Sequence, residues 1–138
     1  MRHRVVTVIG LTVLLCGLGS WGFTANMPTS FQVKAYQGIP YVSGGVGVEE
    51  RDLLHPLGRE YNVKLIFAAK EGNYFAEVPI AIVDGRGRKV LDAVSEGPWF
   101  YTQLPPGMYS VMAQVGGQTQ QRTVQVNQQK QTQLQFHW

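Results

Sequence analysis

The feature that most limits the fold of this chain is an alternation of apolar and polar residues over its second half. In residues 61–69, 76–82 and 109–115, nearly every second side chain is apolar. Successive side chains of a β-strand point to opposite faces of a sheet, so this period of two is typical of strands buried on one face and wetted on the other. Turn sequences such as Asp84–Gly85 and Pro105–Pro106–Gly107 separate these segments.

Further segments of this kind complete the pattern and lie at residues 89–94, 98–104, 119–126 and 132–138. Short strands at such regular spacing predict a sandwich or a barrel. We therefore predict that residues 61–138 form an antiparallel β-sandwich of about seven strands. Pro79 lies inside one segment, and because proline cannot donate to a sheet ladder, we expect an edge strand or a bulge there.

Residues 23–60 show a different pattern, and we expect an extended N-terminal arm followed by a short helix. The arm, residues 23–47, contains prolines and a glycine cluster, with one candidate edge strand around residues 31–36. From Glu49 to Tyr61, leucines recur at helical spacing. We predict a helix of about two turns, kinked or ended before Pro56, because proline disrupts a helix interior.

The N-terminus has the layout of a secretory signal peptide over residues 1–22, with cleavage between about residues 19 and 25. Arg2 and Arg4 precede an uncharged apolar stretch, Val5–Leu15, and small residues follow. An uncleaved membrane anchor is the alternative, although the stretch is shorter than the roughly 20 residues that span a bilayer. Lipid attachment at Cys16, the only cysteine, is a further alternative. We predict a periplasmic or secreted protein, with membrane contact only through an uncleaved leader.

The segment Leu104-Pro105-Pro106-Gly107-Met108-Tyr109-Ser110-Val111, with the upstream hairpin 78–92, carries a family resemblance. It resembles the carboxypeptidase regulatory-like domains of the prealbumin (transthyretin-like) class over residues 62–126. The whole chain is also similar to small exported bacterial proteins. The resemblance implies a transthyretin-like or Ig-like sandwich that serves as an accessory module without catalytic residues. An enzymatic branch of this fold ends in Tyr-Arg-Gly-Ser, whereas this chain ends in Gln135-Phe136-His137-Trp138.

Charge and composition narrow the function classes. Without Arg2 and Arg4, ten of the 12 basic residues remain against nine acidic residues, so the predicted mature chain lies near +1. This balance does not predict a nucleic-acid partner, which needs clustered Lys and Arg. Past the leader, His55 and His137 are the only histidines, and neither has a second ligand at metal-site spacing. We expect no metal and no cofactor.

The residue types that perform hydrolysis do not form a recognisable motif here. Ser43, Ser95 and Ser110 lie outside a nucleophile elbow, and the carboxylates of Glu77, Asp84, Asp92 and Glu96 are spread over a hairpin and a turn. We predict that the chain is not an enzyme and has no catalytic residues. A small hydrolase is a remote alternative.

Two groups of residues are candidates for a partner surface. Trp99, Phe100 and Tyr101 are consecutive, so alternation turns at least one ring away from the core. Exposed aromatic residues mark binding surfaces. The alternative is that the outward ring packs beneath the arm or the helix. Gly44, Gly45 and Gly47 form the second group, because glycine lets another backbone approach closely; a hinge is the alternative.

These observations predict a non-catalytic exported binding or interaction module, accessory to a larger envelope assembly. Its partner would be another envelope protein or a second copy, with a glycan or a peptide as alternatives. The glutamine-rich segment 114–135 is a candidate hydrogen-bonding face or a wetted sheet surface. The runner-up function is a structural subunit that assembles by strand addition through the arm, residues 23–47.

Overall fold

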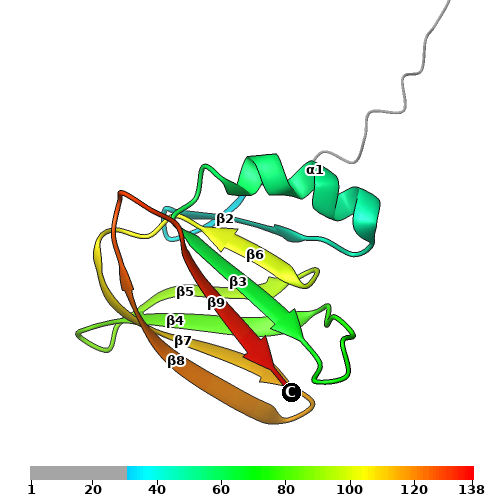
Figure 1. Ribbon diagram of the computed structural model, residues 1–138. Coiled ribbons are helices and arrows are strands. Elements are labelled where there is room, and N and C mark those ends of the chain that lie inside the picture. Colours follow the sequence, from blue (N-terminus) through cyan, green and yellow to red (C-terminus); the bar gives the residue numbers. More distant parts are fainter. Residues whose placement is uncertain (1–30) are drawn as a thin grey trace, which may run out of the picture.

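Two β-sheets packed face to face form the body of the protein, and one helix covers the outer face of the larger sheet (Figure 1). The computed structural model describes residues 31–138, so the predicted leader and Cys16 lie outside the described residues. The five-stranded sheet has the spatial order β1 (Lys34–Tyr36), β2 (Ile39–Gly44), β6 (Trp99–Thr102), β3 (Val63–Ala68) and β9 (Thr132–His137). The four-stranded sheet has the order β5 (Lys89–Ser95), β4 (Val78–Asp84), β7 (Gly107–Val115) and β8 (Gln118–Val126).

The inner faces of the two sheets enclose the main hydrophobic core, as the alternation predicts. Phe67 and Phe136 from the larger sheet meet the aliphatic side chains of β4 and β7 from the smaller one. Burial of apolar area of this kind is the main favourable contribution to folding. The prediction of a mainly β sandwich is therefore confirmed.

The described residues contain nine strands, against about seven predicted in residues 61–138 and one candidate edge strand around residues 31–36. β1 lies within that candidate strand, whereas β2 is not predicted. Strands β3 to β9 occupy the segments predicted as strands, and β1 and β2 come from the predicted arm. Residues 34–44 form a hairpin in which Tyr36 pairs with Ile39, and β2 then pairs with β6. The part of the arm that the structure describes therefore belongs to the sandwich. The turn contains Gly38 at φ 83°, a conformation that glycine adopts without strain.

The expectation of antiparallel sheets is wrong at one edge, because β3 and β9 run parallel. The chain leaves β8 in the four-stranded sheet and crosses to the edge of the five-stranded sheet, where Leu134 pairs with Leu65 and Phe136 with Phe67. Alternation specifies which face of a strand is buried, but it carries no information on the direction of the neighbouring strand.

The helix α1 (Val48–Gly58) runs through Pro56, so it does not end before this proline, and the alternative of a kink there stays a prediction. Proline leaves one carbonyl of the preceding turn without its intrahelical donor. Pro56 lies near the helix end on the exposed side, where water reaches the backbone. Leu54 and Gly58 pack on the sheet from the opposite side, against Val42 and Tyr101, and this contact stabilises the helix.

Pro79 also differs from its prediction, because β4 is an inner strand between β5 and β7. The β4–β7 pairing begins at Ile80, one residue after the proline, so Pro79 is paired with Val94 of β5 only. The missing N–H therefore interrupts no ladder hydrogen bond on the β7 side. The shift in register of β4 lies between Ile82 and Val83.

A buried asparagine links β3 to two connections at one end of the sandwich. The Asn62 side-chain amide donates to the carbonyl of Leu104 (2.7 Å) and its oxygen accepts the Leu104 N–H (2.9 Å). The Asn62 carbonyl accepts the N–H of Thr132 (2.8 Å). Buried polar groups satisfied in this way hold one arrangement of the chain, because any other would leave them unpaired.

We expect Gly58→Ala to destabilise the protein by about 1–3 kcal/mol, because overpacking a tight contact forces the neighbours apart. A Cβ at position 58 would lie 2.3 Å from ring carbons of Tyr101. Gly85→Ala is the matched control, since the nearest atom to its Cβ is 3.8 Å away. Urea unfolding of both variants measures the difference. Equal stabilities would show that α1 does not pack tightly on Tyr101.

Candidate functional site

The three predicted aromatic residues of β6 lie on different faces of the sheet. Phe100 points into the main core, whereas Trp99 and Tyr101 lie on the outer face, towards α1. Tyr101 is only 1% exposed and Phe100 is fully buried, so neither ring can contact a partner of the folded domain. The helix covers Tyr101, which is the alternative arrangement considered from the sequence. Trp99 is partly exposed and remains a candidate.

The predicted glycine segment lies beside Trp99, although more than 50 residues separate them in the sequence. Gly44 pairs with Trp99 in the β2–β6 ladder, and the Cβ position of Gly45 lies 3.4 Å from Cγ of Trp99. Gly44 and Gly45 are buried, whereas Gly47 is exposed at the start of α1. The two candidate groups therefore form one neighbourhood, with positive φ angles of 93° at Gly45 and 89° at Gly47.

A buried lysine lies against the same tryptophan. The Lys64 ammonium is 3.9 Å from the ring centroid of Trp99 and 5.4 Å from that of Tyr101. Lys64 is 8% exposed, and burial lowers the pKa of its ammonium. The faces of both rings attract the cation and offset part of the cost of its burial. The sequence pattern placed Lys64 on a wetted strand face, because alternation does not reveal that a helix covers this face.

An arginine and a tyrosine that the sequence analysis did not select form the open part of this neighbourhood. The guanidinium of Arg51 donates to the carbonyl of Gly45 (3.0 Å) and lies 5.2 Å from the centroid of the Tyr74 ring. With Pro98 and the turn 45–47, they line a hollow of about 130 Å³, which we call the glycine-turn pocket. Tyr74 is 54% exposed. Arginine and tyrosine are enriched where proteins bind partners.

The donors of Arg51 are only partly used. The ion pairs within residues 31–138 are Lys34–Glu96, Arg88–Asp84 and Lys89–Asp92, and none includes Arg51. A guanidinium has five N–H donors in a planar fork that suits a carboxylate. The pocket can therefore bind an anionic or strongly hydrogen-bonding group against the tyrosine ring.

The serines considered for hydrolysis all make hydrogen bonds within the fold. Ser95 donates to the carbonyl of Gly97 (2.6 Å), Ser43 accepts the N–H of Glu96 (3.0 Å), and Ser110 accepts from the amide of Gln121 (2.6 Å). His55 lies 6.4 Å from the Trp99 ring, measured between centroids. Within residues 31–138, His, Asp and Glu side chains do not gather in threes at metal-binding distance.

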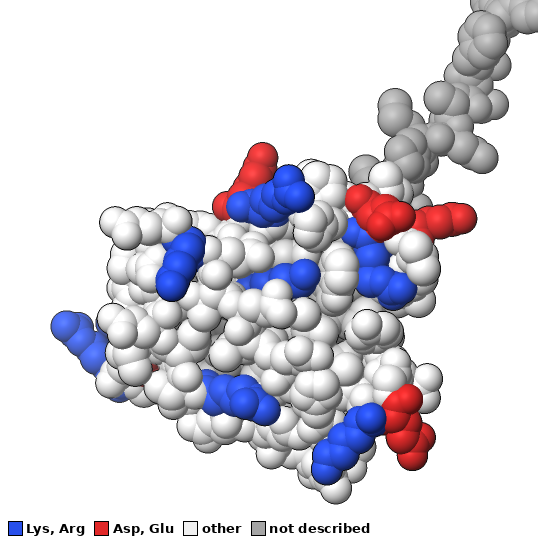
Figure 2. All heavy atoms as spheres, in the orientation of Figure 1, with Lys and Arg blue, Asp and Glu red and all other residues white. Residues whose placement is uncertain are grey.

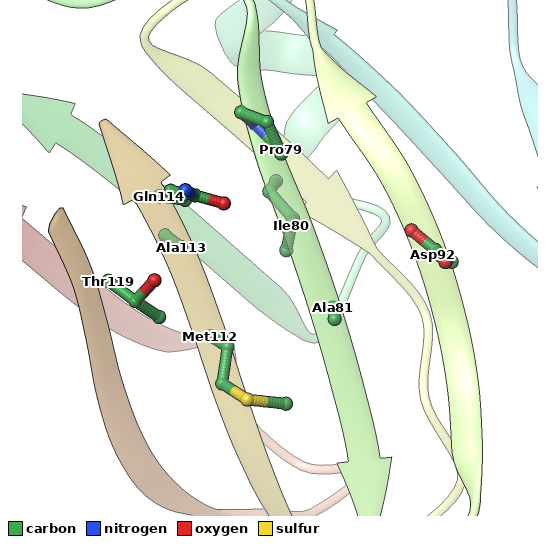
Figure 3. Close-up of a pocket in the computed structure, with 8 residues that line it drawn as sticks. All are labelled: Pro79, Ile80, Ala81, Asp92, Met112, Ala113, Gln114 and Thr119. Carbon is green, nitrogen blue, oxygen red and sulfur yellow. The ribbon is translucent and has the colours of Figure 1, made fainter. Parts of the chain in front are cut away.

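A second, shallower hollow of about 220 Å³ lies on the outer face of the four-stranded sheet. Figure 3 shows Ala81 of β4 between Asp92 of β5 and Met112 of β7, with Gln114 and Thr119 at one side. The small side chain of Ala81 creates the hollow. Its one carboxylate, Asp92, already pairs with Lys89 (3.0 Å). This face can form weak polar contacts. It lacks an exposed ring like Tyr74 and a cation like Arg51, which has no ion-pair partner among residues 31–138.

The basic side chains on the face shown in Figure 2 are spread over the surface, and several of them lie beside acidic side chains. No helix within residues 31–138 has both the length and the apolar composition needed to cross a membrane. Comparison with protein-family models and with curated proteins gives no match for this sequence. The resemblance to carboxypeptidase regulatory-like domains therefore stays a prediction. The function is inferred below from the geometry of the site.

We expect the protein to lose stability at alkaline pH, because burial raises the pKa of Tyr101 from 10.0 to about 12. The folded protein then holds the phenol proton more tightly than the unfolded chain. This contribution is complete below pH 10 and is lost as the pH rises towards 12, up to about 3 kcal/mol. Urea unfolding between pH 8 and pH 11.5 measures it. Tyr101→Phe keeps the ring and should flatten this decline; an unchanged decline would exclude Tyr101 as its source.

Proposed function

We propose that this chain is a non-catalytic exported binding module, accessory to a larger envelope assembly, and that it binds its partner at the glycine-turn pocket. The observation that carries this proposal is the Arg51–Tyr74 pair. The pair combines an exposed aromatic ring with a guanidinium that has no ion-pair partner among the described residues. Such residues contribute most of the binding energy in many protein interfaces.

Rigid elements position the residues of the pocket, so binding a partner costs little conformational entropy. Arg51 belongs to α1, and the burial of Leu54 in the next turn fixes this helix on the sheet. The carbonyl of Gly45 orients the guanidinium of Arg51, and the Trp99 ring packs against Gly45. Trp99 thus acts mainly as a support of the pocket, and substituting it would disturb both the fold and the site.

The chemistry of the pocket favours a partner with a carboxylate or another acceptor-rich group, presented by a peptide segment. The fork of Arg51 binds such a group in a defined orientation. The exposed face of the Tyr74 ring provides apolar contact for the segment that carries it. A pocket of about 130 Å³ accepts one side chain or a chain terminus, not a whole folded surface. The rest of the contact would come from the surrounding rim.

The runner-up proposal is strand addition through the arm, and the fold leaves only part of the arm available for it. Residues 34–44 already pair within the chain's own five-stranded sheet. β1 is an edge strand of only three residues, and short edges pair weakly with other chains. Of the predicted arm, residues 23–33 precede this hairpin, and most of them lie outside the described residues.

A photoreactive benzophenone amino acid placed at position 74 tests the leading proposal in the intact cell envelope. We expect a crosslinked product of defined mass, and Arg51→Gln in the same chain should lower its yield at least about tenfold, because a central arginine of an interface typically contributes 2 kcal/mol or more. The same amino acid at position 123, on the exposed face of β8, is the matched control. Equal products at both positions, or a yield insensitive to Arg51→Gln, would exclude the pocket as the binding site.

A further inference from the structure

A groove lies on the side of α1 away from Arg51, and it shares only Val46 and Gly47 with the glycine-turn pocket. Its apolar side chains come from the start of the described chain, the turn before α1 and the helix itself: Phe31, Val46, Val48 and Leu53. The groove has a volume of about 450 Å³, and Val48 is 65% exposed. Val46 is 58% exposed and Leu53 is 46% exposed, and neighbouring exposed apolar side chains can mark an interaction site.

Carboxylates also line this groove and make it negatively charged. Glu49 and Glu50 are among its lining residues, and Asp52 follows in the same helix. None of the three takes part in the ion pairs of residues 31–138. Figure 2 shows acidic side chains gathered at this end of α1. An occupant of the groove should therefore bring an apolar side chain together with cations.

An apolar side chain and cations lie together at the opposite end of the molecule. The turn between β4 and β5 contains Arg86 and Arg88, and Arg86 has no ion-pair partner within residues 31–138. Met108 lies next to this turn, since the Cβ position of Gly85 is 3.8 Å from the Met108 carbonyl, and Met108 is 50% exposed. In Figure 2, a Lys or Arg side chain projects from this end, where Figure 1 places the β4–β5 turn.

We propose that the groove beside α1 binds the β4–β5 tip of a second copy of this chain, with Met108 of one copy in the groove and Arg86 against the carboxylates of Glu49 and Glu50. Methionine is flexible and fills irregular apolar gaps, and the arginine gains the ion pair that both sides lack. The tip and the groove lie at opposite ends of one molecule, so they cannot meet within a chain (Figure 1).

The contact is heterologous, because the two copies use different surfaces. Each bound copy leaves one groove and one tip free, so association continues head to tail instead of stopping at a dimer. Assembly of this kind needs neither the glycine-turn pocket nor pairing of edge strands. It can therefore be tested apart from the proposed function, although Val46 and Gly47 line both the groove and the pocket.

Sedimentation of the protein purified from the envelope tests the proposal over a range of concentration and salt. We expect the mean mass to rise with protein concentration and to fall at high salt, because salt screens exposed ion pairs. Glu49→Lys and Arg86→Glu should each weaken association at least about tenfold, since each places like charges together at the contact. Glu71→Lys and Lys130→Glu, exposed charge reversals outside both surfaces, should associate like the unaltered chain.

Mixing the two reversed variants provides the decisive result. The groove of the Glu49→Lys chain then faces the tip of the Arg86→Glu chain with the charges exchanged, and its own tip fits the unaltered groove of the other variant. A one-to-one mixture should regain the association of the unaltered chain. The proposal is overturned if the unaltered chain stays monomeric at every concentration, if either reversal leaves association unchanged, or if the mixture stays as weak as its components.

Discussion

The rest of this structure depends on the burial of one strand, β6, on both of its faces. Phe100 faces the core between the sheets, and Tyr101 faces the helix. A strand that carries large aromatic rings on both faces requires a cover on each side, because leaving either ring in water would forfeit the free energy of burying it. The four-stranded sheet covers one face and α1 covers the other. The helix is therefore a third layer of the fold and not an appendage of the arm.

This requirement also sets the geometry of the glycine-turn pocket. A Cβ at Gly97 would lie 2.3 Å from the carbonyl oxygen of Gly44, so the turn before β6 and the end of β2 touch backbone to backbone. The close approach directs the chain from β2 over Trp99 and into α1. As a result the carbonyl of Gly45 meets Arg51 in the second turn of the helix. The same contacts that bury β6 thus orient the guanidinium.

The sequence predicts the strands of residues 61–138 and the faces that form the main core, because a period of two reports which side of a strand is apolar. It does not predict that the other face of β3 and β6 is buried under α1. It does not predict the β1–β2 hairpin, since Gly38 and Pro40 give that segment the composition of a loop. Nor does it select Arg51, in the predicted helix, or Tyr74, between two predicted strands, which come together only when α1 folds onto the sheet. Trp99, Gly45 and Gly47 are found from sequence; the two glycines line the pocket, and Trp99 packs against Gly45.

The glycine-turn pocket and the groove beside α1 share two lining residues. Val46 and Gly47 line both the glycine-turn pocket and the groove, which lie on either side of the N-terminal end of α1. Neighbouring residues of a helix point about 100° apart, so Arg51 faces one side while Glu49 and Leu53 face the other. A second copy in the groove would hold the turn that carries the Gly45 carbonyl, and this carbonyl orients Arg51. A partner in the pocket and a second copy in the groove would both contact the turn 46–47, and a coupling between them would act equally in both directions.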